Sequence, residues 1–148
     1  MVANLLTAAG ADRIVTMDLH AGQIQGFFDI PLDHLDASAV FVPYLESLKL
    51  EHLCIAAPDT GGSERARRYA KRLDADLVVL DKHRAKANVV ESMRVIGDVE
   101  GQNVVIVDDL VDTAGTLCKA AELLRENGAL SVRAIVPPPI LSGPAYER

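Results

Sequence analysis

Residues 104–116 have the sequence VVIVDDLVDTAGT, in which four apolar residues lead directly into two acids and a short polar loop. A continuous run of β-branched residues is typical of a strand buried on both faces, as in a parallel sheet covered by helices. Open parallel sheets bind their ligands beyond the carboxyl ends of the strands. Asp108 and Asp109 follow this strand directly, so the stretch predicts both an α/β fold and the edge of the sheet that carries a site.

The loop at residues 112–116 combines two threonine hydroxyls with the backbone N–H groups that begin an expected helix. Backbone N–H groups and the positive end of a helix favour phosphate binding, and Gly115 allows close approach to the backbone. Together with the neighbouring carboxylates, which can bind hydroxyls or a metal, the loop predicts a sugar-phosphate site. The alternative is a helix start with solvent-facing acids, which explains Asp112 as a cap but leaves the rest of the cluster unexplained.

The composition is that of an ordinary globular protein of about one domain, with 148 residues, 49% hydrophobic and 24% charged. The net charge of −6 argues against general binding to nucleic acid or to a membrane surface, so local groups are expected to hold any anion. Cys54 and Cys118 have no ligand spacing. They are expected to be reduced, buried thiols of a cytoplasmic protein.

Strand and helix patterns alternate along the chain, which predicts a parallel sheet with right-handed crossovers. Strands are expected at residues 13–18, 52–57, 76–80, 93–97, 104–107 and 131–136. Helices are expected up to Gly10 and at residues 38–48, 63–73 and 114–127, with Ser38 as a cap. Residues 29–34 are expected to form a turn, and residues 81–86 a loop.

Residues 58–62, PDTGG, repeat the order of strand end, acid, glycines and helix start. A glycine pair after a strand is often only a tight turn. Two such loops on neighbouring strands, however, would face each other across one crevice, which favours a functional interpretation of both loops.

Three further groups have a functional and a structural interpretation. Asp18 and His20 fall on the same side of an extended segment, but by themselves they suit a surface acid and a hydrogen-bonded histidine. The basic residues of segment 81–86 suit either a solvated loop or an arm that closes over phosphates. The arginines at 65, 68 and 72 are expected to be solvated, with Arg65, nearest the glycine pair, the one candidate for the site.

Taken together, these motifs resemble the ribose-phosphate diphosphokinase, or phosphoribosyl diphosphate (PRPP) synthetase, family. The matching segments are DLHAGQIQGFF at 18–28, PLD at 31–33, PDTGG at 58–62, DKHR at 81–84, AN at 87–88, VDDLVDTAGT at 107–116 and LSGP at 141–144. They occur in the family's order and span nearly the whole chain. The first segment is highly specific, whereas the Asp-Asp loop is shared with phosphoribosyltransferases in general.

The resemblance implies a phosphoribosyltransferase-like α/β fold and a Mg²⁺-dependent transfer of diphosphate from ATP to ribose 5-phosphate, giving PRPP and AMP. It implies that His20 and Asp59 serve the Mg²⁺–ATP site, and it adds Asp18, Asp29 and Asp33 as possible further metal positions. It also implies a catalytic loop carrying Lys82 and Arg84, with Arg84 touching substrate. The implied ribose 5-phosphate residues are Asp108, Asp109, Asp112, Thr113, Ala114, Gly115 and Thr116.

The same resemblance divides the chain into residues 1–36, a remnant of an N-terminal ATP-site domain, and residues 37–148, a truncated ribose 5-phosphate-binding domain. Both ends look cut, so the chain is expected to be a fragment that lacks an upstream segment with ATP contacts. Pro137 and Pro138 stand where the family usually has Thr-His. Family members self-associate, commonly as dimers that build hexamers.

Two other functions stay open at this point. The first is a phosphoribosyltransferase that consumes PRPP, against which the segment at 18–28 argues. The second is a non-catalytic regulatory or binding relative, against which Lys82 and Arg84 argue.

Overall fold

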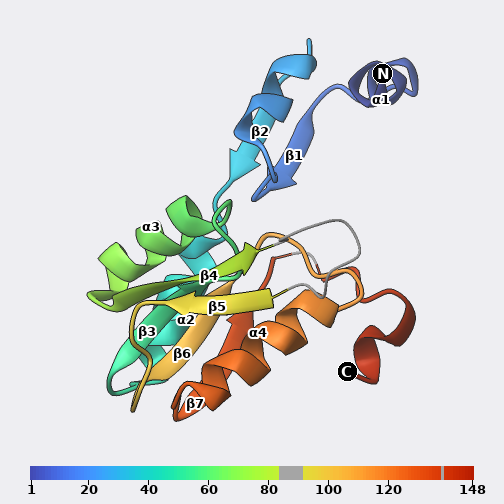
Figure 1. Cartoon of the computed structure of the whole chain (residues 1–148). Coiled ribbons are helices and arrows are strands. Elements are labelled where there is room, and N and C mark those ends of the chain that lie inside the picture. The colour runs from blue at the N-terminus through green and yellow to red at the C-terminus, as the bar shows by residue number, and fades with distance from the viewer. Residues whose placement is uncertain (84–91, 138) are drawn as a thin grey trace.

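Two sheets organise the chain in the computed structural model, which describes residues 1–83, 92–137 and 139–148 (Figure 1). The larger sheet has the strand order β5-β4-β3-β6-β7. Its strands are β3 (Leu53–Ala57), β4 (Asp76–His83), β5 (Ser92–Ile96), β6 (Asn103–Val107) and β7 (Ser131–Ile135). The accompanying helices are α2 (Ser38–Ser47), α3 (Ser63–Leu73) and α4 (Gly115–Glu126), and a short 3₁₀ turn η2 (Gly143–Tyr146) follows.

Strands β3, β4, β6 and β7 are mutually parallel, whereas β5 runs antiparallel to β4. The predicted α/β fold with a parallel sheet flanked by helices is therefore confirmed, with one exception at the edge. The exception has a simple cause in chain length. Only residues 84–91 separate β4 from β5, which is too few for the crossover that a parallel pair requires.

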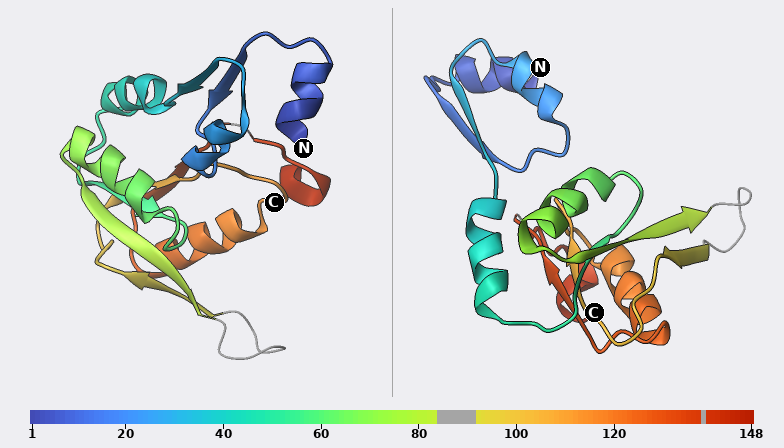
Figure 2. Two further views of the ribbon diagram at one scale, coloured as in Figure 1. Left: turned by 90° about the horizontal axis from the view of Figure 1, so that it is seen from above. Right: turned by 90° about the vertical axis from the view of Figure 1, so that its left-hand side faces the viewer.

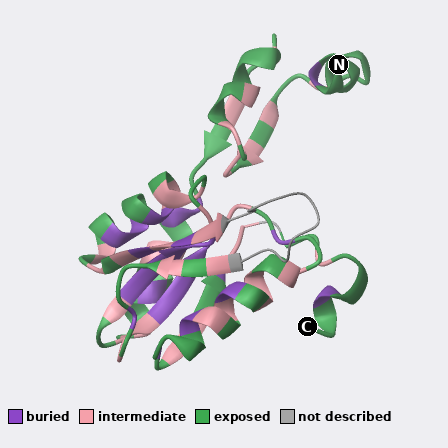
Figure 3. Ribbon diagram, viewed as in Figure 1, coloured by how far each residue is buried: buried purple, intermediate pink, exposed green. Residues whose placement is uncertain are grey.

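The helices cover opposite faces of the larger sheet, as Figure 2 shows. Alternate residues of β3 point to the two faces, since Cys54 packs in the cluster with α4 and Ile55 in the cluster with α2 and α3. Residues Val104 to Val107 of β6 are all at most 1% exposed. The apolar run at 104–107 is thus a central strand covered by helices on both sides, visible as the buried centre in Figure 3.

The connections leave the central pair of strands in opposite directions. From β3 the chain passes through α3 to β4 on one side, and from β6 it passes through α4 to β7 on the other. Neighbouring β3 and β6 therefore form the switch point of the sheet, the place where such folds bind ligands. The loops after these two strands, 58–62 and 108–114, begin at the same edge.

The N-terminal residues form a smaller unit that stands apart from the larger sheet (Figures 1 and 2). It contains α1 (Val2–Ala8), β1 (Ile14–Met17), a 3₁₀ turn η1 (Gly22–Phe27) and β2 (Leu32–Leu35), with β1 and β2 parallel. The prediction of a turn over 29–34 was wrong for residues 32–34, because these residues belong to β2, which pairs with β1. The Arg13 guanidinium, 2.5 Å from the carboxylate of Asp33, adds an ion pair across these strands.

Three local predictions need correction. Ser38 does not cap α2; instead the Ser38 amide donates to the carboxylate of Asp36 at 2.9 Å. Residues 81–83, predicted as part of a loop, belong to β4, because pairing with β5 extends that strand. Cys54 is buried as expected, but Cys118 is only half-buried. Within the described ranges, no helix has the length and apolar character to cross a membrane.

The hydrophobic cluster between α4 and the larger sheet provides a test of which helix face is buried. Leu124 of α4 is fully buried, whereas Leu130 is 61% exposed. We expect Leu124→Ala to lower the free energy of unfolding by about 2–5 kcal/mol, because it removes buried methyl groups and leaves a cavity. Leu130→Ala, the matched control, should change it by less than about 0.5 kcal/mol. Urea denaturation of both variants measures the difference, and equal losses would contradict the assignment of this face.

Candidate functional site

A hollow of about 300 Å³ lies at the carboxyl edge of the larger sheet, where β3, β4 and β6 end. It brings together residues from four separate motifs of the sequence. Its lining consists of His20, Asp59, Lys82, Asp108, Asp109, Leu110, Val111, Asp112, Thr113, Ala114, Gly115, Thr116 and Leu117. Apart from Arg84 and the possible metal positions Asp18, Asp29 and Asp33, every residue that the resemblance assigns to the site therefore lines one cavity.

Asp109 is the charged centre of this hollow. Its side chain is 11% exposed, and its Oδ2 lies 2.6 Å from His20 Nδ1 and 3.3 Å from Arg65 Nη2. Asp108 sits beside it, and Asp108 Oδ1 accepts a hydrogen bond from the Asp109 amide at 2.8 Å. The end of a buried strand thus holds two adjacent carboxylates, one of which contacts both the His20 imidazole and the Arg65 guanidinium.

The two carboxylates have different acidities because their partners differ. Burial, with the side-chain hydrogen bond to Asp109 as the next cause, raises the pKa of Asp108 to about 6. Burial also opposes ionisation of Asp109, but its hydrogen bonds with His20 and Asp108 and the charge of Arg65 outweigh burial and lower its pKa. The pKa values of the two neighbouring carboxyls are therefore shifted in opposite directions, that of Asp108 upward and that of Asp109 downward.

The phosphate-type loop leads into the N-terminus of α4 without a side-chain cap. Ala114, the residue before the helix, has a left-handed backbone with φ +61°, which non-glycine residues rarely adopt. The Asp112 carboxylate does not cap the helix; instead it accepts a hydrogen bond from the Ser142 hydroxyl. The interpretation of Asp112 as a helix cap was therefore wrong, and the first N–H groups of α4 are left for a ligand or water.

Lys82 approaches this loop from the end of β4. Its Nζ donates a hydrogen bond to Thr116 Oγ1 at 3.1 Å. Arg84, the second predicted catalytic residue, lies outside the described residues.

The loop at 58–62 faces the Asp108–Asp109 pair across a smaller hollow of about 190 Å³. The Gly62 amide donates to Asp59 Oδ1 at 2.8 Å, which fixes this carboxylate over the start of α3. A side chain at Gly61 would bring its Cβ within 3.2 Å of the same oxygen, so glycine suits the turn. The expected crevice between the two loops is confirmed.

Arg65 lies closer to the candidate site than the sequence indicated. Its side chain is only 14% exposed, and it pairs with Asp109 instead of remaining solvated. Its Nε is buried without a hydrogen-bond partner among the described residues. Its position three residues after Gly62, in the first turn of α3, was the available signal. Arg68 and Arg72 are exposed, as expected, and Arg72 also donates a hydrogen bond to the Ser38 hydroxyl.

Asp18, Asp29 and Asp33 are not brought into this cavity. The expectation that Asp18 and His20 share one side of an extended segment was wrong, because β1 ends at Met17 and Asp18 has φ +44°. Asp18 Oδ1 accepts a hydrogen bond from the Ala37 amide at 3.1 Å, while His20 reaches Asp109. Asp33 is paired with Arg13.

Of the described residues, no set of three or more His, Cys, Asp and Glu side chains is grouped closely enough to hold a metal alone. Mg²⁺ usually needs only one or two carboxylates, because substrate phosphates and water supply its other ligands. Asp59 and Asp108 line the same hollow, and their oxygens have the chemistry that Mg²⁺ prefers. The residues present therefore fit a Mg²⁺ ion that arrives with a phosphate ligand.

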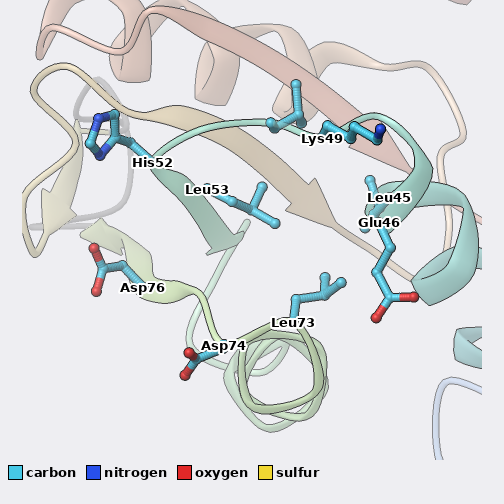
Figure 4. Close-up of a pocket in the computed structure, with 9 residues that line it drawn as sticks. Leu45, Glu46, Lys49, His52, Leu53, Leu73, Asp74 and Asp76 are labelled. Carbon is cyan, nitrogen blue, oxygen red and sulfur yellow. The ribbon is translucent and has the colours of Figure 1, made fainter.

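A second hollow, of about 370 Å³, lies at the opposite, amino end of the strands (Figure 4). It is formed by the end of α2, the end of α3 and the starts of β3 and β4, with Leu45, Leu53 and Leu73 among its lining residues. None of the predicted site residues lines it. Charged side chains also line this hollow, among them Lys49, Asp74 and Asp76, but the residues of the sequence motifs line the hollow at the carboxyl edge.

Known proteins of similar sequence point to the same family as the motifs that line the cavity. The phosphoribosyl transferase domain family matches residues 37–138. Over the whole chain, identity is 56% with a ribose-phosphate pyrophosphokinase of Chlorobaculum tepidum and 57% with that of Wolinella succinogenes. The chain covers 46% and 48% of those proteins, and thus spans about half the length of the curated relatives it matches.

Solved structures give the same picture. The crystal structure of phosphoribosylpyrophosphate synthetase from Mycobacterium smegmatis matches 99% of this chain and 47% of that one, with a TM-score of 0.89 and 41% identity. Adenine phosphoribosyltransferase from Thermoanaerobacter pseudethanolicus matches 75% of this chain and 74% of that one, with a TM-score of 0.56 and 26% identity.

The chain belongs to the phosphoribosyl transferase domain family. Within it, the resemblance to ribose-phosphate pyrophosphokinases, the PRPP synthetases, is confirmed, because it extends over all 148 residues and includes the N-terminal unit.

The raised pKa of Asp108 predicts a dependence of stability on pH. A carboxyl whose pKa is higher in the folded than in the unfolded chain contributes stability below its ordinary pKa of 3.8, and this contribution is lost as the pH rises through about 6. Asp108→Asn should therefore stabilise the chain at pH 7.5, on the order of 1 kcal/mol after allowance for solvent screening, and not at pH 4.

Urea denaturation at several pH values measures this effect, with Asp12→Asn at an exposed position as the control. A stability difference between Asp108→Asn and the unsubstituted chain that does not change between pH 4 and 7.5 would contradict the assignment.

Proposed function

We propose that the protein containing this chain synthesises PRPP by transferring the diphosphoryl group of ATP to the anomeric hydroxyl of ribose 5-phosphate, with AMP as the second product. The observation that carries the proposal is a combination of two facts. The chain aligns over its whole length with ribose-phosphate pyrophosphokinases, and the residues implied by that resemblance line one cavity at the switch point of the sheet.

In this proposal the loop at 112–116 and the start of α4 bind the 5-phosphate through backbone N–H groups and the threonine hydroxyls. The carboxylates of Asp108, Asp109 and Asp112 accept hydrogen bonds from ribose hydroxyls. Lys82, at the end of β4, neutralises charge on the diphosphate as it passes from the α-phosphate of ATP to the sugar oxygen. Arg84 shares that role and contacts substrate. These tasks are positioning and charge stabilisation, which dominate phosphoryl transfer.

Mg²⁺, bound with ATP near His20 and Asp59, would neutralise phosphate charge and orient the diphosphate. The contact of 2.6 Å between His20 Nδ1 and Asp109 Oδ2 supports this role, because it holds His20 at the hollow that Asp59 also lines. Asp18, which accepts a hydrogen bond from the Ala37 amide, would then act mainly by fixing the start of α2.

We also propose a division of labour along the chain. Residues 1–36 belong to the ATP side of the site and residues 37–148 bind ribose 5-phosphate. The family match begins at residue 37, and the preceding residues form their own sheet, which supports this boundary. Self-association into dimers and hexamers, and a cytoplasmic location, stay predictions from the resemblance and the cysteine content.

A chimera tests the activity, because the chain spans about half of its relatives. Residues 1–148 replace the aligned 148 residues of the Wolinella succinogenes protein. We expect the chimera to form AMP and PRPP from Mg²⁺, ATP and ribose 5-phosphate, as followed by ³¹P NMR. Lys82→Ala in the chimera should lower kcat about 100-fold, through loss of charge stabilisation, with ribose 5-phosphate affinity nearly unchanged.

Lys71→Ala, at an exposed position of α3, is the control for Lys82→Ala. Equal loss of turnover and of ribose 5-phosphate affinity would make Lys82 a binding residue. Consumption of PRPP with a nucleobase, in place of PRPP formation, would favour a phosphoribosyltransferase. Ribose 5-phosphate binding with no turnover in the chimera would favour a non-catalytic relative.

The sugar-phosphate loop is tested by binding alone. Asp112→Ala should weaken the affinity of the 148-residue chain for ribose 5-phosphate roughly tenfold or more, because a charged hydrogen-bond acceptor is removed. Calorimetric titration measures the Kd, with Glu126→Ala at the exposed end of α4 as the control. Unchanged affinity for Asp112→Ala would sink the assignment of this loop.

A further inference from the structure

Residues 139–142, here called the strap, run alongside the start of the sugar-phosphate loop. Pro139 forms a parallel bridge with Val111. The amides of Ile140 and Leu141 both donate to the Val111 carbonyl, at 2.9 and 3.3 Å, and the Ser142 amide donates to the Asp112 carbonyl at 3.0 Å. Three successive amides of the strap therefore hold two successive residues of the loop.

The strap has an uncommon backbone at its centre. Leu141 has φ +53°, the left-handed conformation that a leucine rarely adopts and that persists only where surrounding contacts hold it. In this conformation the neighbouring amides of Leu141 and Ser142 both reach the loop. The hydrogen bonds to residues 111 and 112 are thus the contacts that maintain the backbone of Leu141.

Side chains extend the same connection into the loop. The Ser142 hydroxyl donates to Asp112 Oδ1, and Arg148 Nη1 donates to the Thr113 carbonyl at 3.2 Å. The loop is in a left-handed conformation at Ala114 and has no side-chain cap at α4. The loop therefore depends on hydrogen bonds from outside it. The strap, Arg148 and Lys82 supply these hydrogen bonds.

We propose that Ser142 is a positioning residue for ribose 5-phosphate, which orients the Asp112 carboxylate and holds the loop in its binding conformation before the ligand arrives. The inference rests on the proposed function of that loop. Ser142 engages one carboxylate oxygen of Asp112, and the other, which has no hydrogen bond to another described residue, would accept one from a ribose hydroxyl. A loop that is already ordered loses less conformational freedom on binding, so the strap contributes to affinity without touching the ligand.

The test is a double-mutant cycle on ribose 5-phosphate binding, measured by calorimetry on the 148-residue chain. Ser142→Ala should raise the Kd about tenfold, and Ser142→Thr, which keeps a hydroxyl, should restore most of the affinity. In an Asp112→Ala background, Ser142→Ala should have almost no further effect, because Ser142 acts through that carboxylate. Ser47→Ala at the end of α2 is the matched control.

Leu141 supplies a second, independent pair of variants. Leu141→Val keeps an apolar side chain, but β-branched residues strongly disfavour positive φ, so this variant should open the strap and raise the Kd to a similar extent. Leu141→Asn loses the apolar side chain but tolerates positive φ, so it should bind nearly as the unsubstituted chain does. In the chimera, the variants that weaken binding should raise the KM for ribose 5-phosphate several-fold more than they lower kcat.

The possible outcomes separate this inference from the proposed function. If the unsubstituted chain binds ribose 5-phosphate and Ser142→Ala binds equally well, the strap has no positioning role. If Ser142→Ala and Asp112→Ala have additive effects, Ser142 acts independently of Asp112 and the inference is overturned. If neither the unsubstituted chain nor the chimera binds ribose 5-phosphate, the proposed function fails, and this inference fails with it.

Discussion

The parallel pairing of β3 with β6 is the constraint on which the rest of the site depends. Leu53 lies opposite Asn103 and Ala56 opposite Ile106, so the two strands end at the same level of the sheet. Their crossovers leave in opposite directions. The Asp59 loop and the Asp108 loop therefore face each other, and His20 and Arg65 complete the crevice from outside the sheet.

Charge in this crevice is balanced locally, since the chain as a whole carries −6. Two adjacent carboxylates at the end of a buried strand would repel each other if both were fully ionised. Arg65 and His20 both lie against Asp109, and the pKa of Asp108 rises to about 6. Beside them lie the uncapped start of α4, two threonine hydroxyls and Lys82, groups that favour an anion locally although the chain as a whole carries negative charge.

The central strands, and the edge of the sheet at which the candidate residues gather, could be predicted from the sequence, because both depend on local patterns. The run at 104–107 marks a strand buried on both faces, and the acids that follow it fall at the edge where ligands bind. Predictions failed where distant pairing decides the outcome. Strand β2 exists because Ile14 lies opposite Leu32, and β4 extends to His83 because β5 pairs with it. The burial of Arg65 likewise depends on Asp109, 44 positions further along the chain.

The segment LSGP at 141–144 could be recognised in the sequence, but its structural role could not be predicted from it. The segment contributed to the family resemblance, but no local rule links it to a loop 30 positions earlier. In the folded chain Leu141 takes a left-handed backbone and Ser142 bonds Asp112 through both its amide and its hydroxyl. Leucine in this conformation is costly by itself. The hydrogen bonds from the strap to residues 111 and 112 offset this cost. The same hydrogen bonds hold the neighbouring loop, so the unusual backbone of Leu141 serves the geometry of that loop as well as that of the strap.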